Sequence, residues 1–215
     1  MKKVYCEIFN KNQAELFPQL GFLTKEGFYL AGGTGLALQL GHRTSVDFDF
    51  YIRKHFEPSD LYKEIEVVFK KKAQKIAQAE DTLFCTVNKV ELSFFGYEYP
   101  LIKKPVKIKR VAVASLEDIA AMKLIAISHR PVKRDYVDIF YLLKIFPLKK
   151  MFSFVMKKYP NFNQYFSLRA LIYFDDIKVK RGRQVKVLDK KFSWEKAKKE
   201  IFEEVKKYQL EMISS

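Results

Sequence analysis

Residues 30–50 read Leu-Ala-Gly-Gly-Thr-Gly-Leu-Ala-Leu-Gln-Leu-Gly-His-Arg-Thr-Ser-Val-Asp-Phe-Asp-Phe, and this stretch decides how the chain is interpreted. A turn of small residues at 32–34 is followed by two carboxylates, Asp47 and Asp49, inside an apolar run. Aspartate is depleted in strands, and a buried charge without a partner is costly. The pair therefore indicates a bound cation, and the turn, rich in backbone N–H groups, indicates a phosphate. Together they indicate a metal-bound nucleotide.

The turn itself predicts a change from strand to helix. Residues 27–31 are expected to form a short buried strand, and Thr34 is expected to cap a helix that ends at Gly41. Gly32 and Gly33 let the backbone approach a ligand, and the helix N-terminus that follows favours phosphate. An ordinary strand-to-helix turn explains the same residues, so this signal is weak by itself.

The two aspartates belong to a segment with the period of a strand. Apolar residues from Val46 to Ile52 fall on one face, and Asp47 and Asp49 fall on the other. Positions i and i+2 of a strand lie roughly 6–7 Å apart, so both carboxylates can converge on one Mg²⁺ or on a pair. Such metals activate a hydroxyl and stabilise a leaving pyrophosphate. The alternative is a solvated strand face.

The remaining pattern divides the chain into a strand-rich part and a helical part. Strands are expected near residues 75–80, 82–87, 90–95 and 106–113, and helices over 57–72, from Ser115 to about 128, over 132–144 and over 194–210. This pattern predicts an α+β protein with a boundary near residue 112.

Composition narrows the class of protein further. With 215 residues, 48% hydrophobic and 15% aromatic, the chain is expected to fold as one large or two small packed domains. No apolar run is long enough to cross a bilayer, and the N-terminus lacks the apolar core of a signal peptide, so no membrane association is predicted. Cys6 and Cys85 match no metal-ligand spacing. We expect a reduced, cytoplasmic chain.

The formal charge of +15 is distributed unevenly. Residues 178–199 contain ten Lys or Arg (178, 180, 181, 183, 186, 190, 191, 196, 198 and 199) against two acids, Asp189 and Glu195. A local basic stretch of this kind favours RNA or another polyanion. A generally lysine-rich surface is the alternative explanation.

A second block of sequence supports a resemblance to a known family. Residues 114–126 read Ala-Ser-Leu-Glu-Asp-Ile-Ala-Ala-Met-Lys-Leu-Ile-Ala, and 133–143 read Lys-Arg-Asp-Tyr-Val-Asp-Ile-Phe-Tyr-Leu-Leu. With the first stretch, they resemble the AbiEii/AbiGii toxin family of the DNA polymerase β-like nucleotidyltransferase superfamily, the toxin half of type IV toxin–antitoxin pairs. The resemblance covers residues 25–145. It implies a nucleotidyltransferase core over residues 1–112, which forms a mixed sheet flanked by helices. A mainly helical region over residues 113–215 is expected to follow.

The resemblance also implies roles for individual residues. In these implied roles, Gly32, Gly33 and Thr34 hold the triphosphate of an NTP substrate; Asp47 and Asp49 bind Mg²⁺ or Mn²⁺; Lys123 and Arg43 contact phosphate; and Asp135 and Asp138 orient the substrate or act as a base. Simpler roles are also open. Lys123 can extend its ammonium to solvent past an apolar stem, the late aspartates can pair with Lys123, Lys133 or Arg134, and Arg43 can form a salt bridge.

The chain departs from the family pattern at one position. Many members of the superfamily carry a third metal-binding aspartate on a neighbouring strand, and Ser93 aligns with it here. Glu91 lies two residues earlier, on the same strand face, and is the candidate substitute. If Glu91 does not bind the metal, the third ligand is absent, and this branch of the superfamily uses a different mechanism or is inactive.

The resemblance implies transfer of an NMP from an NTP to an acceptor hydroxyl. RNA, in particular a tRNA 3′ end, fits both the family and the basic stretch, and a cognate antitoxin is the implied protein partner. Two alternatives stay open. One is a degraded relative that only binds a nucleotide or a partner, and the other is a transferase that acts on a protein or a small molecule.

Overall fold

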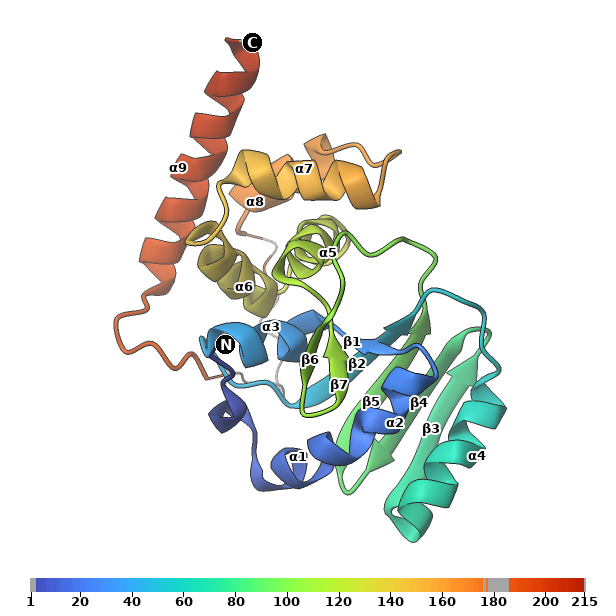
Figure 1. Ribbon diagram of the computed structural model, residues 1–215. Coiled ribbons are helices and arrows are strands. Elements are labelled where there is room, and N and C mark those ends of the chain that lie inside the picture. Colours follow the sequence, from blue (N-terminus) through green and yellow to red (C-terminus); the bar gives the residue numbers. More distant parts are fainter. Residues whose placement is uncertain (1–2, 176, 178–185, 215) are drawn as a thin grey trace. The chain divides into compact units, whose positions relative to one another are not determined.

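The computed structural model describes residues 3–175, 177 and 186–214 and forms two compact units, Met1–Ser115 and Leu116–Ser215. The first unit is a seven-stranded sheet with helices, and the second consists of helices (Figure 1). The predicted α+β class, a mixed sheet with flanking helices, is confirmed. The boundary predicted near residue 112 falls just before this division.

The sheet of the first unit mixes parallel and antiparallel pairs. Its strands are β1 (Tyr29–Leu30), β2 (Asp47–Ile52), β3 (Ala73–Ala79), β4 (Thr82–Val87), β5 (Val90–Gly96), β6 (Val106–Ile108) and β7 (Val111–Val113). They follow the order β3-β4-β5-β2-β1-β7-β6, in which β2 with β5 and β1 with β7 are parallel. The central position of β2 places the predicted carboxylates in the middle of the sheet.

Helices cover one face of this sheet. They are α1 (Lys11–Leu16), α2 (Gly21–Lys25), α3 (Gly32–Leu40) and α4 (Pro58–Phe69), with 3₁₀ turns at Cys6–Ile8, Phe17–Leu20 and Lys70–Lys72. Figure 1 shows α1, α2 and α4 lying over the same side of the strands. Phe48, Phe50 and Phe94 point to that side and are fully buried with Leu20 and Ile65. The opposite faces of β2 and β5 therefore carry Asp47, Asp49, Glu91 and Ser93, together with Tyr51 and Phe95.

Several local predictions are corrected by the structure. Thr34 does not cap a helix, because α3 already begins at Gly32 with Ala31 as its N-cap. The alternation predicts Val46 on the core face, but it is 41% exposed because β2 begins one residue later. The single strand expected over 106–113 is a hairpin, in which Lys109 and Arg110 adopt positive φ values between β6 and β7.

The second unit is helical throughout its described elements. These are α5 (Leu116–His129), α6 (Lys133–Leu143), α7 (Leu148–Lys158), α8 (Tyr165–Ile172) and α9 (Trp194–Ile213). The helices predicted from Ser115, over 132–144 and over 194–210 are thus confirmed within a few residues. Of the predicted basic stretch, Lys178, Lys180, Arg181 and Arg183 lie outside the described residues. Within the described part of the chain, no helix is both long and apolar enough to cross a membrane.

Candidate active site

The glycine turn gives room to two charged side chains. Gly32 has φ +61°, and a Cβ there would lie 2.8 Å from Asp49 Oδ2. A Cβ on Gly33 would lie 2.3 Å from Nη2 of Arg43. A side chain at either position would displace the carboxylate or the guanidinium. The two glycines therefore let an acid of β2 and a buried arginine lie directly against the start of α3.

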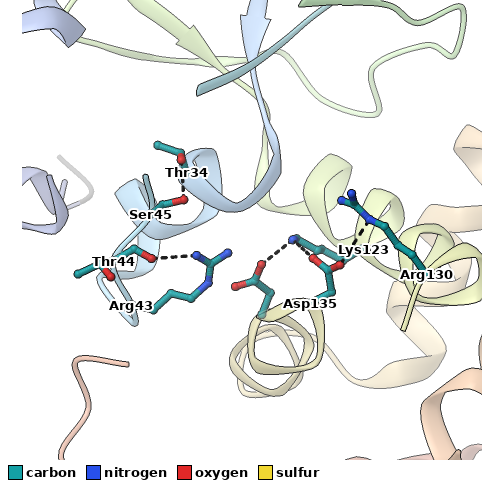
Figure 2. Close-up of polar contacts among 8 residues, drawn as sticks. Thr34, Arg43, Thr44, Ser45, Lys123, Arg130 and Asp135 are labelled. Carbon is teal, nitrogen blue, oxygen red and sulfur yellow. Dashed lines mark hydrogen bonds and ion pairs between the residues drawn. The ribbon is translucent and has the colours of Figure 1, made fainter. Parts of the chain in front are cut away.

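Thr34 ties the start of α3 to the start of β2. Its Oγ1 lies 2.7 Å from the Ser45 hydroxyl and also contacts the Asp47 carbonyl oxygen, and both hydroxyls are buried (Figure 2). Because the Thr34 hydroxyl is engaged in this tether, a phosphate contact from Thr34 would come from its backbone. The first N–H groups of a helix have no acceptor within the helix and carry the positive end of its dipole.

Asp47 and Asp49 lie on the face of β2 opposite the one that α1, α2 and α4 cover. Both aspartates are half-buried. Phe48, which lies between them, and Phe50, which follows Asp49, are fully buried, as the alternation predicts. In the parallel pairing with β5, Asp47 lies opposite Glu91 and Asp49 lies opposite Ser93. Residues paired in this way share a sheet face. The register thus brings all four residues that the sequence singled out to one face.

Arg43 is buried beside the glycine turn. Its side chain is 1% exposed, and Nη1 donates a hydrogen bond of 2.9 Å to the Thr44 carbonyl oxygen (Figure 2). A buried guanidinium next to a helix N-terminus adds a second positive feature to the same spot. The chemistry of this spot suits an anion of high charge, such as a triphosphate.

The second unit contains a buried cluster of one lysine and two aspartates. Lys123 of α5 places Nζ 2.6 Å from Asp135 Oδ1 and 2.6 Å from Asp138 Oδ2, both on α6. The lysine side chain is 7% exposed and the two carboxylates are 1% and 0% exposed. Arg130 is 3.8 Å from Asp135 but largely in solvent (Figure 2). Of the simpler roles considered, pairing of both aspartates with Lys123 is the one that the structure shows.

The comparison with known families decides the identity. Residues 22–211 match a family described as nucleotidyl transferase AbiEii toxin, type IV toxin–antitoxin system. The chain belongs to the AbiEii family. It is a nucleotidyltransferase, and the resemblance drawn from residues 25–145 is confirmed over a longer range.

Individual relatives agree with this assignment. The uncharacterized protein aq_aa25 of Aquifex aeolicus (strain VF5) is 34% identical to this AbiEii protein over 187 residues, which cover 84% of this chain and 87% of the relative. JHP933 from Helicobacter pylori has a TM-score of 0.57 at 17% identity, covering 94% of this chain and 93% of the other. The nucleotidyltransferase toxin MenT4 (Rv2826c) from Mycobacterium tuberculosis H37Rv has a TM-score of 0.57 at 13% identity, covering 90% and 82%. The two structural likenesses show the fold.

A divalent metal fits the carboxylate pair of this AbiEii protein. Mg²⁺ usually takes one or two protein carboxylates and completes its shell with water and substrate phosphates, and Asp47 and Asp49 offer such a pair. Over residues 3–175, 177 and 186–214, no group of three His, Cys, Asp or Glu side chains is arranged to hold a metal. Glu91, which is exposed, therefore stays a prediction as the third ligand.

Two parts of the site were not predicted from the sequence. Ser45 lies within the first signature stretch but has no predicted role there, and only the fold brings it to Thr34, eleven positions earlier. Arg130 follows the helix that carries Lys123, and its approach to Asp135 depends on how α6 packs against α5. Neither contact follows from a periodicity, because each joins two different elements.

Proposed function

We propose that this AbiEii protein is a toxin that transfers an NMP from an NTP to a hydroxyl of RNA, with the 3′ end of tRNA as the first candidate acceptor. The observation that carries the proposal is the position of the Asp49 carboxylate, whose Oδ2 would lie 2.8 Å from a Cβ built on Gly32. This position brings Asp49 of β2 against the first residue of α3, where phosphate groups are favoured.

The residues of the first unit would divide the work between the triphosphate and the reacting phosphorus. Backbone N–H groups at residues 32–34 and the Arg43 guanidinium would hold the β- and γ-phosphates. Asp47 and Asp49 would hold Mg²⁺ or Mn²⁺, which lowers the charge on the phosphates and the pKa of the attacking hydroxyl. The carboxylates are fixed by the strand, so they need not reorganise during the reaction.

The reaction is a displacement at the α-phosphorus. The acceptor oxygen forms a new O–P bond, the bond from the α-phosphorus to the bridging oxygen breaks, and pyrophosphate leaves. The hydroxyl proton goes to a carboxylate or to water. Catalysis of this kind depends mainly on positioning and charge stabilisation, for which a rigid turn and strand are suited.

Lys123, Asp135 and Asp138 form the second set of residues that we propose serves this reaction. The family resemblance assigns Lys123 to the triphosphate and the aspartates to substrate orientation or base catalysis. Lys123 Nζ lies 2.6 Å from a carboxylate oxygen of each aspartate, so the lysine also holds both carboxylates in place and contributes to the stability of the second unit. Variants must therefore separate stability from chemistry.

The test uses NTPs labelled at the α-phosphate, Mg²⁺ and total RNA. We expect label to enter small RNA, to stop on chelation of the metal and to stop with Asp49→Asn. Asp60→Asn is the matched control, because Asp60 is an exposed acid of α4 in the same unit. Parallel reactions contain a protein extract or an aminoglycoside in place of RNA. Label on either of these would correct the acceptor, and nucleotide binding without transfer to any acceptor would indicate a degraded relative.

The toxin role is tested in cells. Expression of the chain is expected to stop growth, and Asp49→Ala is expected to relieve the arrest. A protein encoded beside this chain is the first candidate antitoxin, and its co-expression should restore growth. Continued growth on expression of the intact chain would contradict the toxin role.

A further inference from the structure

The face of the sheet opposite α1, α2 and α4 carries a connected group of aromatic rings near Asp49. Tyr51, Phe84, Phe95, Tyr97 and Tyr99 form this aromatic strip. Ring centroids are 5.7 Å apart for Phe84 and Phe95, 5.4 Å for Phe95 and Tyr51, 5.2 Å for Tyr51 and Tyr97, and 5.2 Å for Tyr97 and Tyr99. The rings thus form a connected path.

The strand register places this path beside the carboxylates. Tyr51 follows Asp49 by two residues on β2 and so shares its face, and it pairs with Phe95 across the parallel ladder. Phe84 pairs with Ser93, which itself lies opposite Asp49. Tyr51 therefore lies one same-face step from Asp49, and Phe84 lies two strand spacings from Asp49, on the far side of Ser93.

Exposure distinguishes the strip from the core. Phe48, Phe50 and Phe94 on the covered face are fully buried. The rings of the strip keep part of their surface in solvent, and Tyr99 is 36% exposed. A contiguous exposed apolar patch with polar groups around it marks a candidate interaction site.

Positive charge flanks the strip beside two of its chain segments. The exposed residues Arg53 and Lys54 follow the end of β2, and the exposed residues Lys103 and Lys104 follow the segment with Tyr97 and Tyr99. The Tyr97 N–H donates to the Ile52 carbonyl at 2.7 Å, which holds the two segments together. These two segments, residues 51–54 and 97–104, contain four Lys or Arg residues and one acidic residue, Glu98. Stacking rings beside cations are the common means of binding a single strand of nucleic acid.

We propose that the aromatic strip binds unpaired bases of the RNA acceptor by stacking and leads the strand toward Asp47 and Asp49. A single nucleobase covers one ring, whereas the strip extends over five, so its length fits a strand better than the incoming nucleotide. Duplex RNA hides its base faces, so the acceptor must present an unpaired segment. The role of the strand as acceptor rests on the proposed function, but its binding does not.

The test measures binding without turnover. Asp49→Asn protein is titrated into a fluorescent single-stranded RNA of about 12 nucleotides, a usual site size for such binders. Tyr99→Leu and Tyr97→Leu are each expected to weaken binding about 5- to 100-fold, the range found for loss of one stacking ring. Leucine keeps apolar volume, and a melting curve confirms that each variant is folded. Tyr165→Leu on α8, where the ring is 61% exposed, is the matched control and should change nothing.

Two further titrations distinguish a base of single-stranded RNA from a base of duplex RNA and from the base of the NTP. The same variants are titrated with the RNA duplex and with NTP and Mg²⁺, where we expect changes of less than about twofold. Single-strand affinity that is unchanged in both Leu variants would overturn the proposal, as would a loss confined to NTP or shared equally by the duplex. A protein that binds single strands through these rings but transfers no label would refute the proposed function alone.

Discussion

Replacing Lys123 with Met tests the buried cluster of the second unit. The substitution keeps the length of the side chain but removes the cation that lies 2.6 Å from each of two carboxylates. Asp135 and Asp138 are almost fully buried, so neither gains water in exchange. Arg130 compensates little, because it is 3.8 Å from one carboxylate and its side chain is 58% exposed.

The expected cost follows from the loss of a buried ion pair. Removing one partner of such a pair costs about 3–5 kcal/mol, because the remaining charge is left unpaired in a poor solvent for it. For a chain of this length, that corresponds to a fall in Tm of roughly 6–20 °C. Urea unfolding at pH 7, followed by circular dichroism, measures the change. A cost below about 1 kcal/mol would refute this account of the cluster.

A second variant separates stability from chemistry. Lys123→Met combined with Asp135→Asn and Asp138→Asn contains no charge in the cluster, so we expect most of the lost stability to return. Label transfer should stay at the level of Lys123→Met, since the groups proposed to act on the substrate are still missing. Transfer that returns together with stability would show that the cluster only supports the fold.

Three other predictions concern separate parts of the chain. Gly33→Ala should change stability by less than about 1 kcal/mol but slow transfer about tenfold or more, because its Cβ would displace the buried guanidinium beside it; equal transfer at saturating NTP would contradict this. Asp118→Asn should destabilise the chain by about 3–5 kcal/mol in a urea titration, because it leaves the Lys158 ammonium, 2.9 Å away and 0% exposed, without its carboxylate; an unchanged midpoint would exclude that role. A hydrogen bond to the Asp81 carboxylate and its negative charge raise the pKa of His55 above 6.5. The stabilisation from this ion pair should therefore be fully present below pH 6.5 and be lost as the pH rises through the raised pKa of His55. An NMR titration of His55 should show a midpoint above 6.5, and the midpoint should fall in Asp81→Asn.

The sequence predicted those features of the fold that depend on local pattern. The alternation around Asp47 and Asp49 predicted β2 and the direction of both carboxylates, because one face of that strand is buried and the other is only half-buried. The long amphipathic segments predicted α4, α5, α6 and α9 within a few residues. The periodic spacing of apolar residues is a strong signal of secondary structure wherever a single face of the helix or strand is buried.

Contacts between distant elements could not be predicted in this way. The start of α3 was misplaced because the Thr34 hydroxyl bonds to Ser45 and β2 instead of capping its own helix. The two aspartates that share Lys123 were recognised as a pair, but their packing against α5 depends on tertiary structure. The aromatic strip joins β2, β4, β5 and the segment after β5, and no single window of sequence displays it.

Transfer of labelled NMP to RNA by Asp49→Asn, compared with Asp60→Asn, tests the central claim most directly. Both variants remove one negative charge from the first unit, but only Asp49 lies against Gly32 at the start of α3. We predict a loss of about 100-fold or more for Asp49→Asn at unchanged stability, and no loss for Asp60→Asn. Equal transfer by the two folded variants would contradict the assignment of the carboxylate pair to the reaction.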